Sequence, residues 1–336
     1  MSANEQRGGD PSAVGVLRAR RGIRTLGICA VPLVAVLVLG AVLLLDGAEP
    51  LRRAPARTRL TPERRKQIVY AQYAGVDWLK LGEPKPGEWL SILAEPGQTY
   101  EEYVRVARNL KSERRDTIYL LPLGRMDKQT TATLNQMAEF AGIFFACKVR
   151  VLPAVALPKS AYVHRRKQYD AAEILRRMAR HVPKDALAVV GVTTADLYSG
   201  RLAFVFGLAS LRSRVAVYSL RRYGTPGTPE FLRRALKIVA HETGHVFAIT
   251  HCIFYRCCMN GSNSLDESDS QPLHYCPLCH DKLRHALAFD PEERFKKLAA
   301  FYDKIGFEQE ARVVRGRLEG LAAPAAAEAA PAAVEE

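Results

Sequence analysis

The sequence predicts an α/β fold in which helices pack on a mixed, largely parallel β-sheet. Two observations lead to this prediction. Segments with helical apolar spacing alternate with short runs of β-branched and aromatic residues between residues 99 and 218. A longer helical segment, residues 231–247, then carries two histidines four positions apart. We therefore expect one sizeable domain over residues 61–290, with a functional site on its last long helix.

The expected elements follow one another closely along the chain. Amphipathic helices are predicted at residues 99–110, 131–141 and 171–181, where apolar side chains recur on one helical face. The predicted strands are residues 118–121, 149–152, 187–192, 203–206 and 215–218. After the domain, two charged amphipathic stretches predict a helical hairpin over residues 291–319. The Ala-Pro-Glu composition of residues 320–336 predicts a disordered tail.

The segment from His241 to His245 reads H-E-T-G-H and spans slightly more than one helical turn. Residues four apart lie on the same helical face, so both imidazoles can bind one metal ion. His251 is the expected third ligand, and three nitrogen ligands leave a fourth position open, as in catalytic zinc sites. Glu242 is placed to act as a general base, while Gly244 is predicted to be a point of close packing. Two surface histidines on a helix would be the alternative for the short motif alone, and the third histidine argues against it.

Four cysteines after the third histidine have the spacing of a second, structural metal site. They form a C-x4-C pair and a C-x2-C pair: Cys252, Cys257, Cys276 and Cys279. Four thiolates make a closed, tetrahedral zinc site without an open position. Because Cys252 directly follows His251, the two predicted sites would share a wall. The remaining cysteines, Cys29, Cys147 and Cys258, complete no disulfide framework.

The complete pattern, H-E-x-x-H-x5-H-C-x4-C-x-M followed by C-P-x-C, resembles the archaemetzincins, a branch of the metzincin zinc peptidases with a second, four-cysteine zinc. The likeness covers roughly residues 76–290. It includes residues 117–124, 191–198, 204–210 and 219–224. Details at residues 87–90, 97–100, 261–263 and 272–273 are closer to the animal-type members than to the short archaeal ones. The resemblance implies a metzincin-like mixed sheet with an active-site helix.

The resemblance also implies roles for residues outside the metal-binding pattern. Met259 occupies the position of the Met-turn residue beneath the catalytic metal. The expected substrate edge strand, which would hold an extended peptide by main-chain hydrogen bonds, comprises Ala203, Phe204, Val205, Phe206 and Gly207. A buried core strand is an equally good interpretation of these residues. The chain departs from the family at Ala248, where the family has glycine.

We therefore expect a zinc metallopeptidase with two zinc ions per chain that hydrolyses peptide bonds of a peptide or protein substrate by a zinc-activated water, with Glu242 as general base. The alternative is a catalytically silent peptide-binding module stabilised by two zinc ions, which Ala248 keeps open. A zinc-ribbon-like nucleic-acid binder is a third hypothesis. The net charge of +14 invites it, but the arginines are scattered without interleaved aromatic residues. We expect no nucleic-acid partner, and the oligomeric state stays undetermined.

The N-terminal residues predict a membrane anchor. A basic tail, residues 1–24, precedes an uncharged stretch, residues 25–45, which is long enough to cross a bilayer as a helix. A buried core helix is the alternative for this stretch. We expect a transmembrane signal-anchor there, followed by a tether at residues 46–60. Arginines flank both sides, so the charge difference across the segment is small. We expect a single-pass membrane protein with an extracytoplasmic catalytic domain, although exposed thiolates would need zinc for protection in an oxidising compartment.

Overall fold

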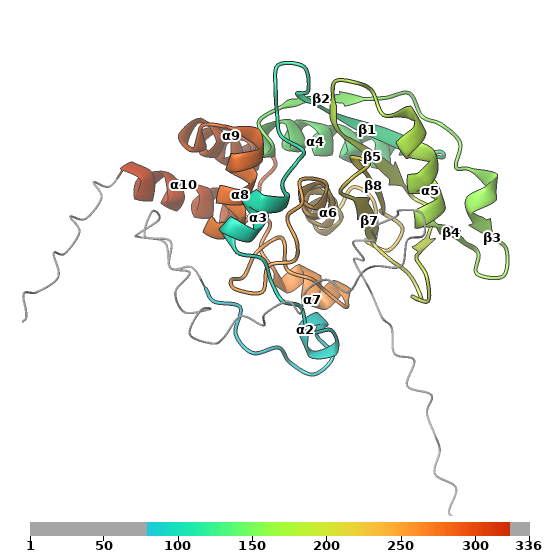
Figure 1. Cartoon of the computed structure of the whole chain (residues 1–336), viewed down its shortest axis with the longest axis horizontal. Coiled ribbons are helices and arrows are strands. Elements are labelled where there is room, and N and C mark those ends of the chain that lie inside the picture. The colour runs from blue at the N-terminus through green and yellow to red at the C-terminus, as the bar shows by residue number, and fades with distance from the viewer. Residues whose placement is uncertain (1–78, 323–336) are drawn as a thin grey trace, which may run out of the picture. The chain divides into compact units, whose positions relative to one another are not determined.

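The computed structural model describes residues 79–322 of the chain. Its main sheet has five strands in the order β2-β1-β5-β8-β7 (Figure 1). These strands are β1 (Thr117–Leu123), β2 (Lys148–Val151), β5 (Ala186–Thr193), β7 (Gly207–Ser210) and β8 (Val215–Ser219). All neighbouring pairs are parallel except β7 and β8, which pair antiparallel. The structure thus confirms the predicted mixed, largely parallel sheet.

The sheet is buried on both faces because its central strands are almost continuously apolar. All eight residues of β5 are buried, which is typical of a parallel strand covered by helices on both sides. In β1 the side chains alternate between two apolar clusters. Ile118 and Leu120 belong to one cluster, and Tyr119 and Leu123 belong to the other. Two helical layers therefore cover the sheet.

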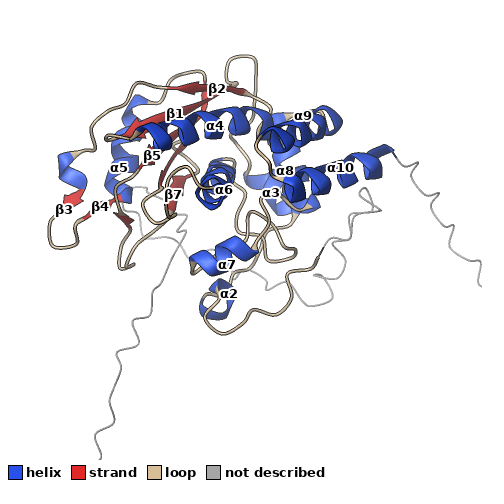
Figure 2. Ribbon diagram, turned by 180° about the vertical axis from the view of Figure 1, so that it is seen from behind, coloured by secondary structure: helices blue, strands red, loops and turns tan. Residues whose placement is uncertain are grey.

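One of the two helical layers, which contains α4 and α6, carries the candidate site. The helices α4 (Lys128–Phe144) and α6 (Pro229–Val246) contact each other beneath one face of the sheet, whereas α5 (Ala171–Met178) packs on β7 and β8 from the other face (Figure 2). The start of α6 is well defined because the Thr228 hydroxyl accepts a hydrogen bond from the Phe231 amide and Pro229 occupies the first turn. The helix then runs under β7 and β8.

The remaining elements complete the domain. They are α2 (Trp89–Ile92), α3 (Tyr100–Val106), α7 (Leu265–Ser270), α8 (Pro277–Leu287), α9 (Pro291–Lys304) and α10 (Glu308–Ala322), with the one-turn helices η2 (Lys159–Ala161) and η3 (Ala179–His181). A small second sheet contains β3 (Tyr162–Val163), β4 (Gln168–Asp170) and β6 (Leu197–Tyr198). The helices α9 and α10 pack against each other, as expected for the terminal hairpin.

One predicted strand is wrong in its position. Residues 203–206 were expected to form it, but the ladder with β8 begins at Gly207, which pairs with Tyr218. Because β8 ends at Ser219, the residues before Gly207 lie outside the ladder. The Phe206 carbonyl still accepts a hydrogen bond from the Ser219 amide, and Val205 forms an isolated bridge with Leu197. Their aromatic side chains pack instead, with the rings of Phe204 and Phe206 5.3 Å apart.

The membrane prediction concerns residues that the structure does not describe. Within residues 79–322, no helix is both long and apolar enough to span a bilayer. The basic tail at 1–24, the stretch at 25–45 and the tether at 46–60 all lie outside these residues. The tail at 320–336 is described only to Ala322.

Candidate active site and metal centres

The end of α6 brings two of the three predicted histidines together. His241 and His245 lie in the last two turns of the helix, and their Nε2 atoms are 3.1 Å apart. The backbone at Gly244 is closely covered, because a Cβ at this position would lie 2.2 Å from the Tyr275 hydroxyl and 2.7 Å from Met259 Sδ. This confirms the predicted close packing. Met259 is fully buried against the helix from which the histidines project.

Ala248 makes the turn that returns the chain to the histidines. Its φ angle is 66°, in the left-handed region that glycine adopts without a Cβ penalty. The side chain of Gln98 holds this turn from both sides. Its Nε2 donates to the Ala248 carbonyl at 3.1 Å, and its Oε1 accepts from the Thr250 amide at 3.3 Å. Two hydrogen bonds from Gln98, far away in the sequence, therefore hold the turn in which Ala248 has this conformation.

His251 completes a group of three converging imidazoles. Its ring centroid lies 5.3 Å from that of His241 and 5.0 Å from that of His245. Its Nδ1 donates to the Glu95 carboxylate at 2.8 Å. The Nε2 atom is buried and has no hydrogen-bond partner among the described residues. A carboxylate that holds the far nitrogen of a histidine is a common support of metal-binding imidazoles.

The donor set fits a metal ion because the other Nδ1 atoms are also occupied. His241 Nδ1 lies 2.8 Å from the Cys258 carbonyl, and His245 Nδ1 lies 2.7 Å from the Ile249 carbonyl. A carbonyl only accepts hydrogen bonds, so each Nδ1 must carry the proton and each Nε2 must present a lone pair. Facing lone pairs repel one another unless a cation lies between them. Neutral His241 and His245 thus present Nε2, as in the tautomer that binds zinc.

Burial reinforces this protonation state. Desolvation, with a smaller contribution from neighbouring His251, lowers the pKa of His241 to about 3. Desolvation, with smaller contributions from His241 and His251, holds the pKa of His245 well below its usual range. Protonated imidazoles would be positively charged and could not act as ligands, so the low pKa values keep both side chains in the ligand form.

Glu242 lies beside the histidines and under the start of β7. Its side chain is buried, and this burial raises the pKa of Glu242 to about 8. A cation at the histidines would favour the ionised carboxylate and oppose this shift. A Cβ on Gly207 would lie 2.4 Å from Glu242 Oε1, so only glycine allows the strand to approach this carboxylate.

The four cysteines form a separate cluster next to the histidines. Their sulfur atoms all lie within 4.8 Å of one another, and Cys252 Sγ is 3.7 Å from Cys276 Sγ. Sulfurs about 2.3 Å from a tetrahedral zinc are about 3.8 Å apart, so the cluster has the dimensions of a four-thiolate site. Cys257 Sγ accepts hydrogen bonds from the amides of Met259 and Cys276. All four cysteines are free and buried.

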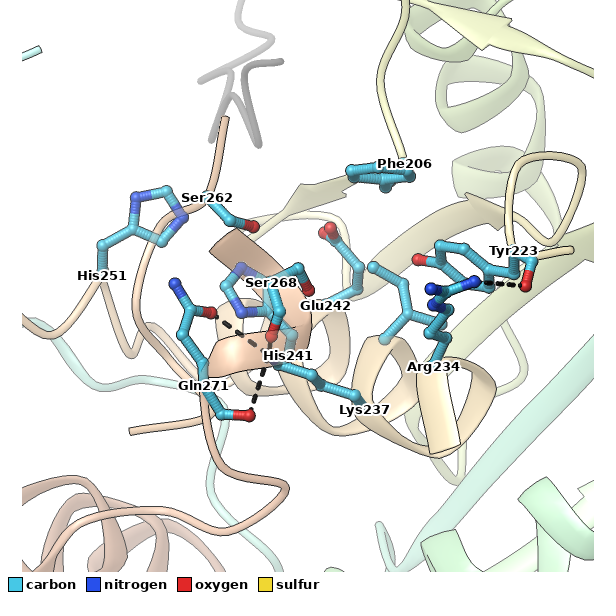
Figure 3. Close-up of a pocket in the computed structure, with 12 residues that line it drawn as sticks. Phe206, Tyr223, Arg234, Lys237, His241, Glu242, His251, Ser262, Ser268 and Gln271 are labelled. Carbon is cyan, nitrogen blue, oxygen red and sulfur yellow. Dashed lines mark hydrogen bonds between the residues drawn. The ribbon is translucent and has the colours of Figure 1, made fainter. Parts of the chain in front are cut away.

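A cavity of about 40 Å³ adjoins two of the three histidines, His241 and His251 (Figure 3). His241, Glu242 and His251 lie on its wall, together with Phe206 and Gly207. Of the five residues expected in the substrate strand, the structure therefore brings these last two to the site. Ala203 instead accepts hydrogen bonds through its carbonyl from Arg166 and Gln168, in the region of the small sheet. The predicted histidines and cysteines are all brought together as expected, whereas their occupancy by zinc stays a prediction.

Sequence reasoning missed the segment that supports the third histidine. Glu95 and Gln98 contact His251 and the turn at Ala248, and the ring of Trp89 meets His251 edge-on at 5.4 Å. The only sequence signal was the resemblance at residues 87–90 and 97–100. No spacing rule connects Glu95 to a histidine 156 positions later.

We predict that Ala248→Gly will tighten metal binding at the histidines. Alanine at positive φ costs about 1–2 kcal/mol, and glycine removes this strain from the turn that positions His251. Chelator titration that follows each metal separately should show slower loss from the histidine site and unchanged loss from the cysteine site. Equal or weaker retention in the glycine variant would show that Ala248 is unstrained.

Comparison with known proteins identifies the family of this chain. The model of peptidase family M54 matches residues 143–285. Archaemetzincin of Pyrococcus furiosus is 37% identical over 185 residues, which cover 52% of this chain and 95% of that protein. Archaemetzincin-2 of Homo sapiens is 29% identical over 261 residues, which cover 65% and 72% of the two chains. A solved archaemetzincin structure from Methanopyrus kandleri covers 53% of this chain and 99% of its own at 29% identity, with a TM-score of 0.48. The chain belongs to the archaemetzincin family of zinc metallopeptidases.

Proposed function

We propose that this protein hydrolyses peptide bonds at a zinc ion held by His241, His245 and His251, with Glu242 as the general base. The observation that carries the proposal is the convergence of the three histidines, whose ligand atoms lie within 4.8 Å of one another, with His241, His251 and the buried carboxylate of Glu242 on the wall of one cavity. Zinc bound there would supply Lewis acidity, which polarises a carbonyl and makes water more acidic. The substrate is a peptide or protein.

Glu242 performs the proton transfers in this proposal. It takes a proton from the attacking water and delivers it to the leaving amine. Its burial under Gly207 excludes bulk water from the carboxylate, so the proton stays within the site. Gly207 lines the cavity and begins β7, the edge strand of the main sheet. An extended peptide can lie beside this strand and exchange main-chain hydrogen bonds with it.

The second zinc in the proposal is structural. Four thiolates at Cys252, Cys257, Cys276 and Cys279 leave no open coordination position for a substrate. The cluster ties the segment after His251 to the start of α8, where Cys276 is the residue before the first turn. Its role is to fix the chain on which the third histidine lies.

A catalytically silent peptide-binding module is the second candidate. The strained φ of Ala248, in the turn that positions a ligand, is the observation that favours it. Both candidates share the same metal sites, and they differ only in turnover. Measured peptide hydrolysis by the zinc-loaded chain separates them.

Elemental analysis should find two zinc ions per chain. Cys276→Ser should lose one of them together with much of the folded structure, because structural zinc contributes folding energy directly. Cys147→Ser is the matched control, since Cys147 lies outside both clusters and should leave both metals in place. One zinc or none in a folded wild-type chain would contradict the two-site proposal.

Glu242→Gln should retain zinc while any peptide hydrolysis falls by about two to four orders of magnitude, which is the usual contribution of a general base. The substitution keeps the size of the side chain and removes its capacity to accept the proton. Glu139→Gln removes a half-exposed carboxylate that pairs with Lys304 and should leave turnover unchanged. Unaltered activity in Glu242→Gln would place the base elsewhere.

The membrane anchor at residues 25–45 and the extracytoplasmic domain are also part of the proposal. They rest on the uncharged stretch and on its flanking arginines. The full-length chain should stay in the membrane pellet after alkaline carbonate extraction, and external protease should digest its domain in intact cells. Release into the carbonate supernatant would rule out a spanning anchor, and protection from external protease would reverse the orientation.

A further inference from the structure

The cavity beside the histidines continues along α6 towards the start of the helix. Arg234, Lys237 and His241 line it at intervals of one helical turn, about 5 Å along the axis (Figure 3). The opposite wall is formed by the segment after Met259, through Ser262, Ser268 and Gln271. In the proposed peptidase, a substrate group that enters this cavity therefore lies next to the scissile peptide bond, which is held at His241 and Glu242.

One positively charged side chain in the cavity, Lys237, makes no ion pair with a carboxylate of the described residues. Lys237 is 4% exposed, and its ammonium donates to the Ser268 carbonyl and to the backbone and side-chain carbonyl oxygens of Gln271. These acceptors are all neutral. The guanidinium of Arg234, by contrast, pairs with the Asp269 carboxylate at 3.0 and 3.1 Å. Burial lowers the pKa of Lys237 to about 8, although the nearby Asp269 opposes this shift.

Two hydroxyl groups face the same space. Ser262 and Ser268 line the cavity, and within residues 79–322 neither side chain makes a hydrogen bond. A hydroxyl can donate to an anion that also accepts from an ammonium. The volume of about 40 Å³ is room for about three water molecules, which is suited to a carboxylate.

We propose that this cavity binds a carboxylate of the substrate, which the positive charge of Lys237 attracts and the hydroxyl groups of Ser262 and Ser268 hydrogen-bond, so that the enzyme selects a negative charge next to the scissile bond. The carboxylate comes from an acidic side chain or from the C-terminus of the peptide. This inference rests on the proposed peptidase function and adds a substrate class to it. Glu242 lines the same cavity, and its charge opposes an anion, so the selectivity depends on the ammonium of Lys237.

Binding tests the inference without turnover. The probes are alanine hexapeptides with a single Glu or Gln at each position, each made as the free acid and as the C-terminal amide. They are titrated calorimetrically into the zinc-loaded full-length chain carrying Glu242→Gln. If the carboxylate comes from a side chain, the Glu peptide should bind about tenfold to a hundredfold more tightly than the Gln peptide at one position. If it comes from the C-terminus, the free acid should exceed the amide by the same factor. The position identifies a side-chain source, and the acid-to-amide ratio identifies the C-terminus.

Variants in the same background assign the preference to the cavity. Lys237→Met keeps the length of the side chain and should bring the affinity ratio close to one. Because Lys237 also holds the carbonyls of residues 268 and 271, Ser262→Ala is a second variant that leaves those contacts in place and should lower the ratio several-fold. Lys304→Met removes a distant exposed charge and should not change it. Equal affinity for charged and neutral peptides, or a ratio that persists in both cavity variants, would overturn the inference.

Cleavage of the same peptides by the wild-type chain separates this inference from the proposed function. A matching preference in kcat/KM supports both. Tight, charge-selective binding without hydrolysis would refute the peptidase proposal and leave the carboxylate site standing. Hydrolysis without charge selectivity would support the peptidase proposal and refute the carboxylate site.

Discussion

Three imidazole lone pairs held face to face are the constraint on which the rest of the site depends. The Nε2 atoms of His241 and His245 are 3.1 Å apart, and each ring is fixed by a hydrogen bond from its opposite nitrogen. Such an arrangement is repulsive by itself, so the surrounding structure must hold it in place. The helix α6 fixes two rings through its own geometry. The third ring depends on a turn, a distant carboxylate and a neighbouring cluster of thiols.

The adjacency of His251 and Cys252 joins the two clusters into one unit. His251 faces the helix, while Cys252 faces Cys276 at the start of α8. Asn260 strengthens the connection, because its side-chain amide donates to the Cys252 and Tyr255 carbonyls and its oxygen accepts from the Cys257 amide. A displacement of the cysteine cluster would therefore move the third histidine. The position of the third histidine thus depends on the cysteine cluster.

Much of the architecture could be predicted from the sequence because it follows from local patterns. The periodicity of α6, the buried run of β5 and the spacing of the metal-binding residues all act over short distances. The prediction failed where tertiary partners decide the structure. Residues 203–206 have the composition of a strand, but they precede the β7–β8 ladder, and Val205 forms only an isolated bridge with Leu197 of β6. Glu95 and Gln98 could not be assigned because their partners lie about 150 residues away.

The separation of Gln98 and Glu95 from their partners also bears on the order in which the domain folds. The four cysteines lie within residues 252–279, so only a short loop has to close to assemble them. The histidine site needs contacts across 150 and 156 positions, and these form only when the early part of the chain docks on the late part. Loop-closure entropy thus favours assembly of the cysteine cluster first. The histidine site is completed last, after the early part of the chain has docked on the late part.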